Sequence, residues 1–146
     1  LARYLGLLPG MSEEECERAA ARIASLPQGR IPEIESISVL PNRRALYQHV
    51  RGGGSLPLGD LLRHPGDRSL PLDAIPLLHT RGRELTRDPS PDLLLRQGDR
   101  ILFAATAESL RAIETIAVNE NVLSYVMTGD EQPGGWVFRR LRRPEG

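Results

Sequence analysis

The chain has 146 residues, 40% of them hydrophobic, which suits one globular domain with appended segments. Its 19 basic and 19 acidic residues give a formal net charge of +0, which argues against a general polyanion-binding protein. Every basic residue is arginine, which we interpret as a coding bias. No apolar run approaches the roughly 18–20 residues that cross a bilayer, and the single cysteine, Cys16, excludes an internal disulfide and is compatible with a reducing compartment.

The first segment, residues 1–29, contains a predicted amphipathic helix. Ser12 followed by Glu15 is a capping-box pattern, in which a hydroxyl and a carboxylate bond reciprocally to backbone N–H groups. Apolar residues then recur at helical spacing from Cys16 to Ile23, and Pro27-Gln28-Gly29 ends the element. The apolar side of this helix requires a partner surface.

The central segment, residues 30–118, opens with two predicted strands. Glu33–Leu40 alternates polar and apolar residues, and Pro41-Asn42 ends it. Arg44–Val50 is the second candidate strand. The glycine-rich stretch Arg51–Ser55 is expected to form a flexible turn.

A polar loop and a hairpin follow in the predicted order. Arg63–Leu70 is the loop, and Ala74–His79 is a strand that Pro76 confines to an edge or a bulge, because proline lacks a backbone donor. Arg81-Gly82 is a hairpin turn that leads into Glu84–Arg87.

The most informative stretch runs from Asp88 to Ile116. Its first five residues, Asp-Pro-Ser-Pro-Asp, cannot form regular structure, because each proline removes a donor and restricts its predecessor. Gly98-Asp99 turns the chain, and Ile101–Ala105 reads as a short buried strand. Thr106 is the expected cap of a helix. We expect the buried side of that helix to consist of Leu110, Ile113 and Ile116.

The last segment, residues 119–146, is predicted to be an extension with a candidate hairpin. Val122–Met127 resembles a strand, and Trp136–Leu141 is either a strand or one turn of helix. The four arginines between residues 139 and 143 are interpreted as a solvated tail rather than a nucleic-acid surface, because supporting basic charge is missing elsewhere.

The predicted fold class is therefore α+β. We expect a small, predominantly antiparallel sheet with core order β-α-β-β-β-α over residues 44–117 and helices on one side. The N-terminal helix and the C-terminal extension are additions to this core.

No catalytic or metal-binding motif accompanies this pattern. The three histidines lie in different segments, without the spacing of a helical metal pair: His49, His64 and His79. Asp88, Asp92 and Asp99 suggest either a cation site or side chains that bond to turn backbone, and we favour the second. We expect Asp99 to hold the corner structurally, and substitution of Gly98 to cost more than substitution of Asp99 if Gly98 has a positive φ.

The stretch from Asp88 to Ile116 resembles the C-terminal lobe of the domains that regulate potassium conductance, the TrkA-C or RCK-C family. Members carry a turn rich in proline and aspartate, then Gly-Asp, an apolar strand and a short helix. Ser55–Leu62 also fits the family pattern Ser-x-hydrophobic-x-Gly before a short helix. The resemblance covers about half of the chain. Two positions depart from it: His79 stands where lysine or arginine is more usual, and Ala105 where glycine is common.

The resemblance implies a cytoplasmic regulatory domain of a potassium channel or transport protein, not an enzyme. It also implies a homodimer whose ligand, as in the family, is a nucleotide, a cyclic dinucleotide or a cation, and the residues do not choose among these. Because the chain begins with Leu1, we expect it to be a fragment of a longer protein.

A ligand cleft is expected where arginines lie in loops and at strand ends, since guanidinium groups bind phosphate or carboxylate oxygens at two points. The candidate residues are Arg63, Arg68, His79, Arg81 and Arg83. Two alternatives stay open: a constitutive assembly domain that binds no small molecule, and a small enzyme that uses Asp and His as acid and base.

Overall fold

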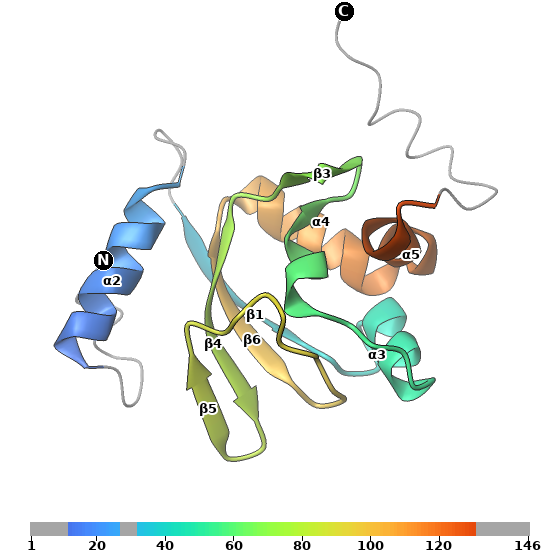
Figure 1. The fold of residues 1–146 in the computed structure, drawn as a ribbon, viewed down its shortest axis with the longest axis horizontal. Coiled ribbons are helices and arrows are strands. Elements are labelled where there is room, and N and C mark those ends of the chain that lie inside the picture. Colours follow the sequence, from blue (N-terminus) through green and yellow to red (C-terminus); the bar gives the residue numbers. More distant parts are fainter. Residues whose placement is uncertain (1–11, 27–31, 131–146) are drawn as a thin grey trace, which may run out of the picture.

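The computed structural model describes residues 12–26 and 32–130, which form an α+β fold around a four-stranded antiparallel sheet (Figure 1). The strand order is β1-β6-β4-β5, with bounds β1 (Glu33–Ser38), β4 (Ala74–Arg81), β5 (Glu84–Arg87) and β6 (Arg100–Ala105). A second, two-stranded sheet pairs β2 (Arg63–His64) with β3 (Asp67–Pro71). The helices are α2 (Glu13–Ala24), α3 (Arg44–Arg51), α4 (Ala107–Val118) and α5 (Glu120–Thr128), with a 3₁₀ helix, η1, at Leu58–Leu62. The predicted fold class is confirmed.

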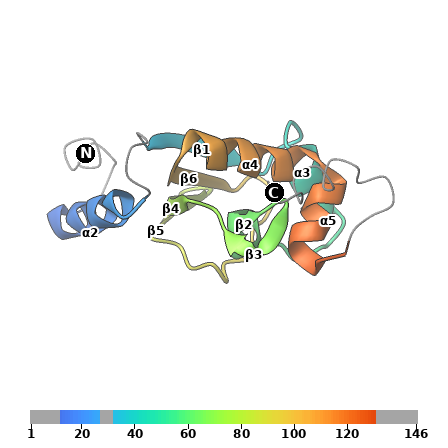
Figure 2. The same cartoon turned by 90° about the horizontal axis from the view of Figure 1, so that it is seen from above.

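Helices pack on both faces of the four-stranded sheet (Figure 2). The larger hydrophobic core joins one face of β1 and β6 to α3, α4, α5 and η1, with Phe103 fully buried in it. The smaller core joins the other face to α2, through Cys16 and Ile23 of the helix and Ile75 and Leu77 of β4. The apolar side of α2 therefore finds its partner surface on the sheet.

The capping box of α2 forms as predicted. The Glu15 backbone N–H donates to the Ser12 hydroxyl at 3.3 Å, and the Ser12 N–H donates to the Glu15 carboxylate at 2.8 Å. These bonds satisfy two N–H groups that a helix start otherwise leaves without partners.

The turn, strand and helix predicted between residues 98 and 116 are confirmed. Gly98 has φ 82°, a left-handed conformation that glycine adopts without steric cost, and β6 follows it. The Thr106 hydroxyl accepts from the Ser109 N–H and caps α4. The predicted apolar residues of that helix are all buried: Leu110, Ile113 and Ile116.

The proline in β4 lies at a bulge, as its sequence context predicts. The pairing of β4 with β6 shifts register between Pro76 and Leu78. The other neighbour, β5, pairs only with residues from Leu78 to Arg81. Pro76 thus lies at a bulge and where β4 has a single strand neighbour, two settings in which a sheet accepts a residue without a backbone donor.

Two predicted strands are helices, so these predictions were wrong. Arg44–Val50 forms α3, with Leu46 fully buried and Val50, four residues later, packed against the same core. Val122–Met127 lies within α5, which begins where the Asn119 side chain accepts from two backbone N–H groups. In both cases the apolar residues are spaced for one helical face as well as for a strand, and a helical neighbour, α4, provides the surface.

The remaining differences concern residues 63–70 and the C-terminal segment. The predicted polar loop Arg63–Leu70 instead forms most of the β2–β3 hairpin. The first strand of the candidate C-terminal hairpin, Val122–Met127, is part of α5 instead. The second, Trp136–Leu141, lies outside the described residues. Because Val122, Leu123 and Val126 lie in the larger core, α5 packs as part of the same hydrophobic unit as α4.

Replacing Leu110 with alanine is expected to lower the free energy of unfolding by about 2–5 kcal/mol, because this side chain is 3% exposed in the larger core. The matched control is Val118→Ala on the same helix, whose side chain is 47% exposed and should change stability little. Urea unfolding of both variants measures the difference. Equal effects would contradict the assigned face of α4.

Candidate functional site around Asp99

Asp99 lies at the corner before β6 and is fully buried. Its carboxylate accepts the Arg96 N–H at 2.8 Å, which closes the turn around Gly98. Two backbone bonds join this turn to the residue after β1: Val39 N–H donates to the Asp99 carbonyl, and Gly98 N–H donates to the Val39 carbonyl. The corner is therefore fixed by its own side chain and by a neighbouring segment.

Arg81, near the end of β4, binds the Asp99 carboxylate at two points. Its Nε donates to Oδ1 at 2.9 Å and its Nη2 donates to Oδ2 at 2.8 Å. The same Nη2 donates to the Leu94 carbonyl at 2.9 Å. This two-point geometry is the strong form of a charge-assisted hydrogen bond. It joins β4, the segment before the turn, and the corner.

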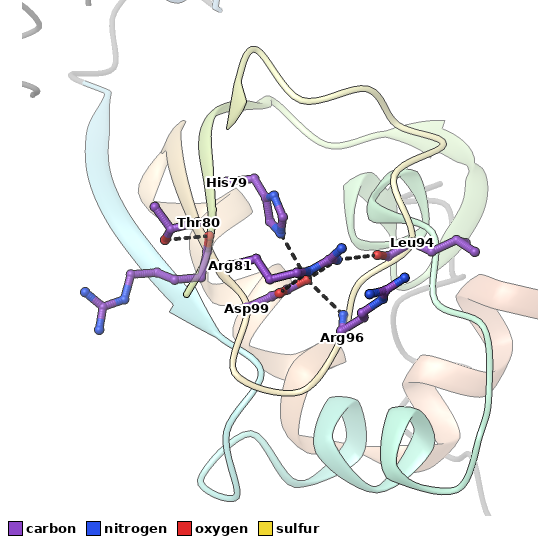
Figure 3. A network of polar contacts seen from close by, with 7 residues as sticks. His79, Thr80, Arg81, Leu94, Arg96 and Asp99 are labelled. Atoms are coloured by element: carbon purple, nitrogen blue, oxygen red, sulfur yellow. Dashed lines mark hydrogen bonds and ion pairs between the residues drawn. The ribbon is translucent and has the colours of Figure 1, made fainter. Parts of the chain in front are cut away.

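His79 approaches the same carboxylate from two residues earlier on β4. Residues two apart on a strand point to the same face, and Figure 3 shows His79 and Arg81 directed toward Asp99. The His79 Nε2 lies 3.0 Å from Asp99 Oδ2, and the imidazole is 4% exposed. The contact is close but poorly aligned, so Nε2 lacks a well-formed hydrogen bond within the described structure. We call Asp99, Arg81, His79, Arg96 and Leu94 the Asp99 network.

The Asp99 network favours the ionised carboxylate. Burial raises the pKa of Asp99, but the hydrogen bonds from Arg81 and from the Arg96 N–H, with the close contact to His79, together lower the pKa below its ordinary value. The bond to Asp99 correspondingly raises the pKa of Arg81. The network thus contains a carboxylate and a guanidinium that both stay charged at neutral pH.

This electrostatic arrangement predicts a pH dependence. Because the pKa of Asp99 is lowered on folding, its contribution to stability is present above the unfolded pKa of about 3.9 and disappears as the pH falls through the lower folded value. The stability difference between the wild type and Asp99→Asn should therefore shrink below about pH 4. Urea unfolding of both proteins from about pH 7 to about pH 2 tests this. A difference that stays constant over this range would contradict a role for the ionised carboxylate.

Arg63 and Arg68, two of the five predicted ligand-binding residues, make internal contacts at the β2–β3 hairpin. Arg63 Nε donates to Asp60 at 3.1 Å, and its Nη1 donates to the Arg68 carbonyl at 3.3 Å. The Arg68 guanidinium donates to the carbonyls of Val126 and Met127, at the end of α5. A cation is favourable there because helix C-terminal carbonyls lack helical donors.

The structure brings the predicted residues together in two groups rather than one. His79 and Arg81 meet at Asp99, while Arg63 and Arg68 meet at the other hairpin. Arg83 is exposed in the turn between β4 and β5. Figure 1 shows β3 and the β4–β5 turn at opposite ends of the sheet, which β4 spans with eight residues.

The partners of Asp99 were not predicted from the sequence. A signal was present in the two-residue spacing of His79 and Arg81: a strand extended past the predicted end at His79, through Arg81, directs both side chains to one face of the sheet. The predicted structural role of Asp99 matches its burial and its bond to the Arg96 N–H.

The chemistry available to this site is that of a buried structural ion pair. The side chains of His79 and Asp99 are both almost closed to solvent. Within residues 12–26 and 32–130, no group of three His, Cys, Asp or Glu side chains is arranged to hold a metal ion. Over the same residues, no helix combines the length and apolar character needed to cross a membrane.

Comparisons with known proteins find no match for this chain: no model of a known protein family, no curated protein and no solved structure matches it.

Proposed function

We propose that this chain is the cytoplasmic regulatory lobe of a potassium channel or potassium transport protein, resembling the TrkA-C or RCK-C family. The supporting observation is that the two sequence segments that carry the resemblance pack directly on each other. Leu58 N–H donates to the Leu93 carbonyl, Gly59 N–H to the Pro91 carbonyl and Leu95 N–H to the Leu56 carbonyl, at 2.8–2.9 Å.

The close packing of these two segments depends on the absence of a side chain at Gly59. A β-carbon at this position would lie 3.1 Å from the Pro91 Cβ and 3.2 Å from the Pro91 carbonyl oxygen. Glycine thus allows η1 to approach the proline turn closely. The glycine of one motif segment and the proline of the other are therefore complementary, which favours a single functional unit over two unrelated turns.

The proposed mechanism is a shift between subunit arrangements. A ligand that binds one arrangement more tightly than the other changes their populations, and the change is transmitted to a pore. The homodimer supplies the second subunit, and the ligand classes are nucleotides, cyclic dinucleotides and cations.

Calorimetric titration with these three ligand classes, together with sedimentation at tens of micromolar protein, tests the proposal. We expect a dimer and saturable binding of one class. Potassium flux in cells that express the native protein should then respond to that ligand. A dimer that binds none of the ligands would favour the assembly-only alternative, and a monomer that binds none would contradict the proposal.

A further inference from the structure

A small cleft lies between α2 and the β4–β5 side of the sheet, away from the Asp99 network. Its volume is ≈ 180 Å³. Ala19, Pro76 and Leu77 provide apolar lining. Arg18 and Arg22 on α2 and Arg87 on β5 add three guanidinium groups. An apolar lining beside several convergent cations is the composition of a site for an organic anion.

The cleft carries a surplus of positive charge. Its lining contains two carboxylates, Glu15 and Asp88, against three arginines. Arg22 pairs with Asp88, and Arg87 Nε lies 3.5 Å from Glu15. Arg18 pairs only loosely, at 3.7 Å, with Glu14 on its own helix. Ion pairs this exposed contribute at most about 1 kcal/mol, so an incoming anion can compete with them.

Asp88 supplies an independent sign of function. Its φ is 46°, and it is the only non-glycine residue with a positive φ among the described residues. The following residue is Pro89, which further restricts the backbone of Asp88. Backbone strain of this kind concentrates at ligand sites and switches. Here it places a carboxylate on Arg22, at the wall of the cleft.

We propose that this cleft binds a small organic anion, a carboxylate or phosphate with a compact apolar part. Its charged group binds Arg18, Arg22 and Arg87, and its apolar part contacts Pro76 and Leu77. The ligand carboxylate or phosphate takes the place of the Asp88 carboxylate on Arg22.

Displacement of the Asp88 side chain from Arg22 is transmitted to the rest of the domain through the turn that follows Asp88. A second hollow, of ≈ 360 Å³, shares Arg22, Pro76 and Asp88 with the cleft and continues along the turn to Pro91. Pro91 accepts the hydrogen bond from Gly59 described above. Occupation of the cleft therefore acts on the turn that packs against η1. This inference rests on the proposed ligand-sensing function and deepens it by selecting an anion over a cation and by naming a site.

Calorimetric titrations of the full chain at constant ionic strength distinguish the contribution of the charged group from that of the apolar part. The four probes are phenyl phosphate, benzoate, inorganic phosphate and benzyl alcohol. We expect phenyl phosphate or benzoate to bind, inorganic phosphate to bind more weakly, and benzyl alcohol not to bind. The better of the two aromatic anions distinguishes phosphate from carboxylate recognition. Binding of benzyl alcohol as tight as that of the anions would overturn the proposal.

Two substitutions should change the affinity in opposite directions. Arg18→Gln removes a cation without breaking an ion pair between α2 and the sheet, and should weaken anion binding roughly tenfold. Asp88→Gly removes the competing carboxylate and suits the positive φ, and should strengthen binding by up to about fivefold. Arg111→Gln on the exposed side of α4 is the control and should have no effect.

An affinity that neither Arg18→Gln nor Asp88→Gly changes would overturn the site, as would the absence of binding by both aromatic anions. Circular dichroism and thermal unfolding of each variant verify that the fold is retained. The sedimentation measurement is independent of these titrations, so a failed cleft does not by itself contradict the proposed regulatory function.

Discussion

Replacing Asp99 with alanine is expected to lower the free energy of unfolding by about 3–5 kcal/mol, because it leaves buried charged and polar groups without their partner. Arg81 loses both hydrogen bonds to the carboxylate, and the Arg96 N–H loses its acceptor. His79, whose side chain is 4% exposed, loses the carboxylate that lies 3.0 Å from its Nε2. Removing Asp99 lowers the free energy of unfolding by more than the ion pair contributes, because its former partners stay buried without an acceptor.

Urea unfolding at neutral pH measures this effect, with two comparisons from the same turn region. Asp92→Ala removes an exposed carboxylate and should cost less than about 0.5 kcal/mol. Gly98→Ala should cost about 1 kcal/mol, because φ is 82° although no atom lies within 4 Å of the added methyl. The structure thus predicts the opposite order from the sequence, which indicated the larger cost at Gly98. An Asp99→Ala effect no larger than that of Gly98→Ala would contradict the importance of the Asp99 network.

The elements that could be predicted from the sequence are those with strong local signals. Ser12 with Glu15, Gly98 and Thr106 each act on backbone groups within a few residues, so their effects do not depend on distant packing. Pro76 similarly restricts its strand wherever that strand lies. Prolines, glycines and capping side chains therefore gave correct turns, bulges and helix starts.

The two segments wrongly predicted as strands, Arg44–Val50 and Val122–Met127, contain no proline or glycine that would mark a turn or a bulge. Both are short segments whose apolar residues fit one face of either a helix or a strand, and the choice between the two is made by the surface they pack on. That surface is α4, which contacts both α3 and α5. The Arg43 guanidinium also donates to Glu114 of α4 at 2.6 Å, a contact between residues 71 apart in the sequence. Contacts at this separation cannot be read from a local pattern.

The same limit applies to the candidate site. The sequence placed Arg63, Arg68, His79, Arg81 and Arg83 in one cleft because all lie in predicted loops or strand ends. Two of these regions lie at opposite ends of β4, and the strand register decides which arginine meets which carboxylate. The bulge at Pro76 shifts that register by one residue. The spacing of His79 and Arg81 puts them on one face, but a shift of one residue exchanges the two faces of a strand, so the three-dimensional pairing decides that this face meets Asp99.

Replacing Phe103 with alanine is expected to have a comparably large effect, about 3–5 kcal/mol. Phe103 is fully buried and is the largest such side chain in the described structure. It lies in β6, one of the two interior strands, opposite Glu35 of β1 and Pro76 of β4, and faces the core formed with α3, α4 and α5. Its removal would leave a cavity that rigid strands on both sides cannot close.

The neighbouring residue, Leu102, provides the matched control. It lies on the other face of β6, only partly buried, against the core that includes α2. Leu102→Ala should therefore cost clearly less than Phe103→Ala, because it loses less buried area and the smaller core can adjust around it. The two variants differ by one position on the same strand, so their comparison measures which face of β6 carries the main core. If Leu102→Ala proved as costly as Phe103→Ala, the assignment of the larger core to the α4 side of the sheet would be wrong.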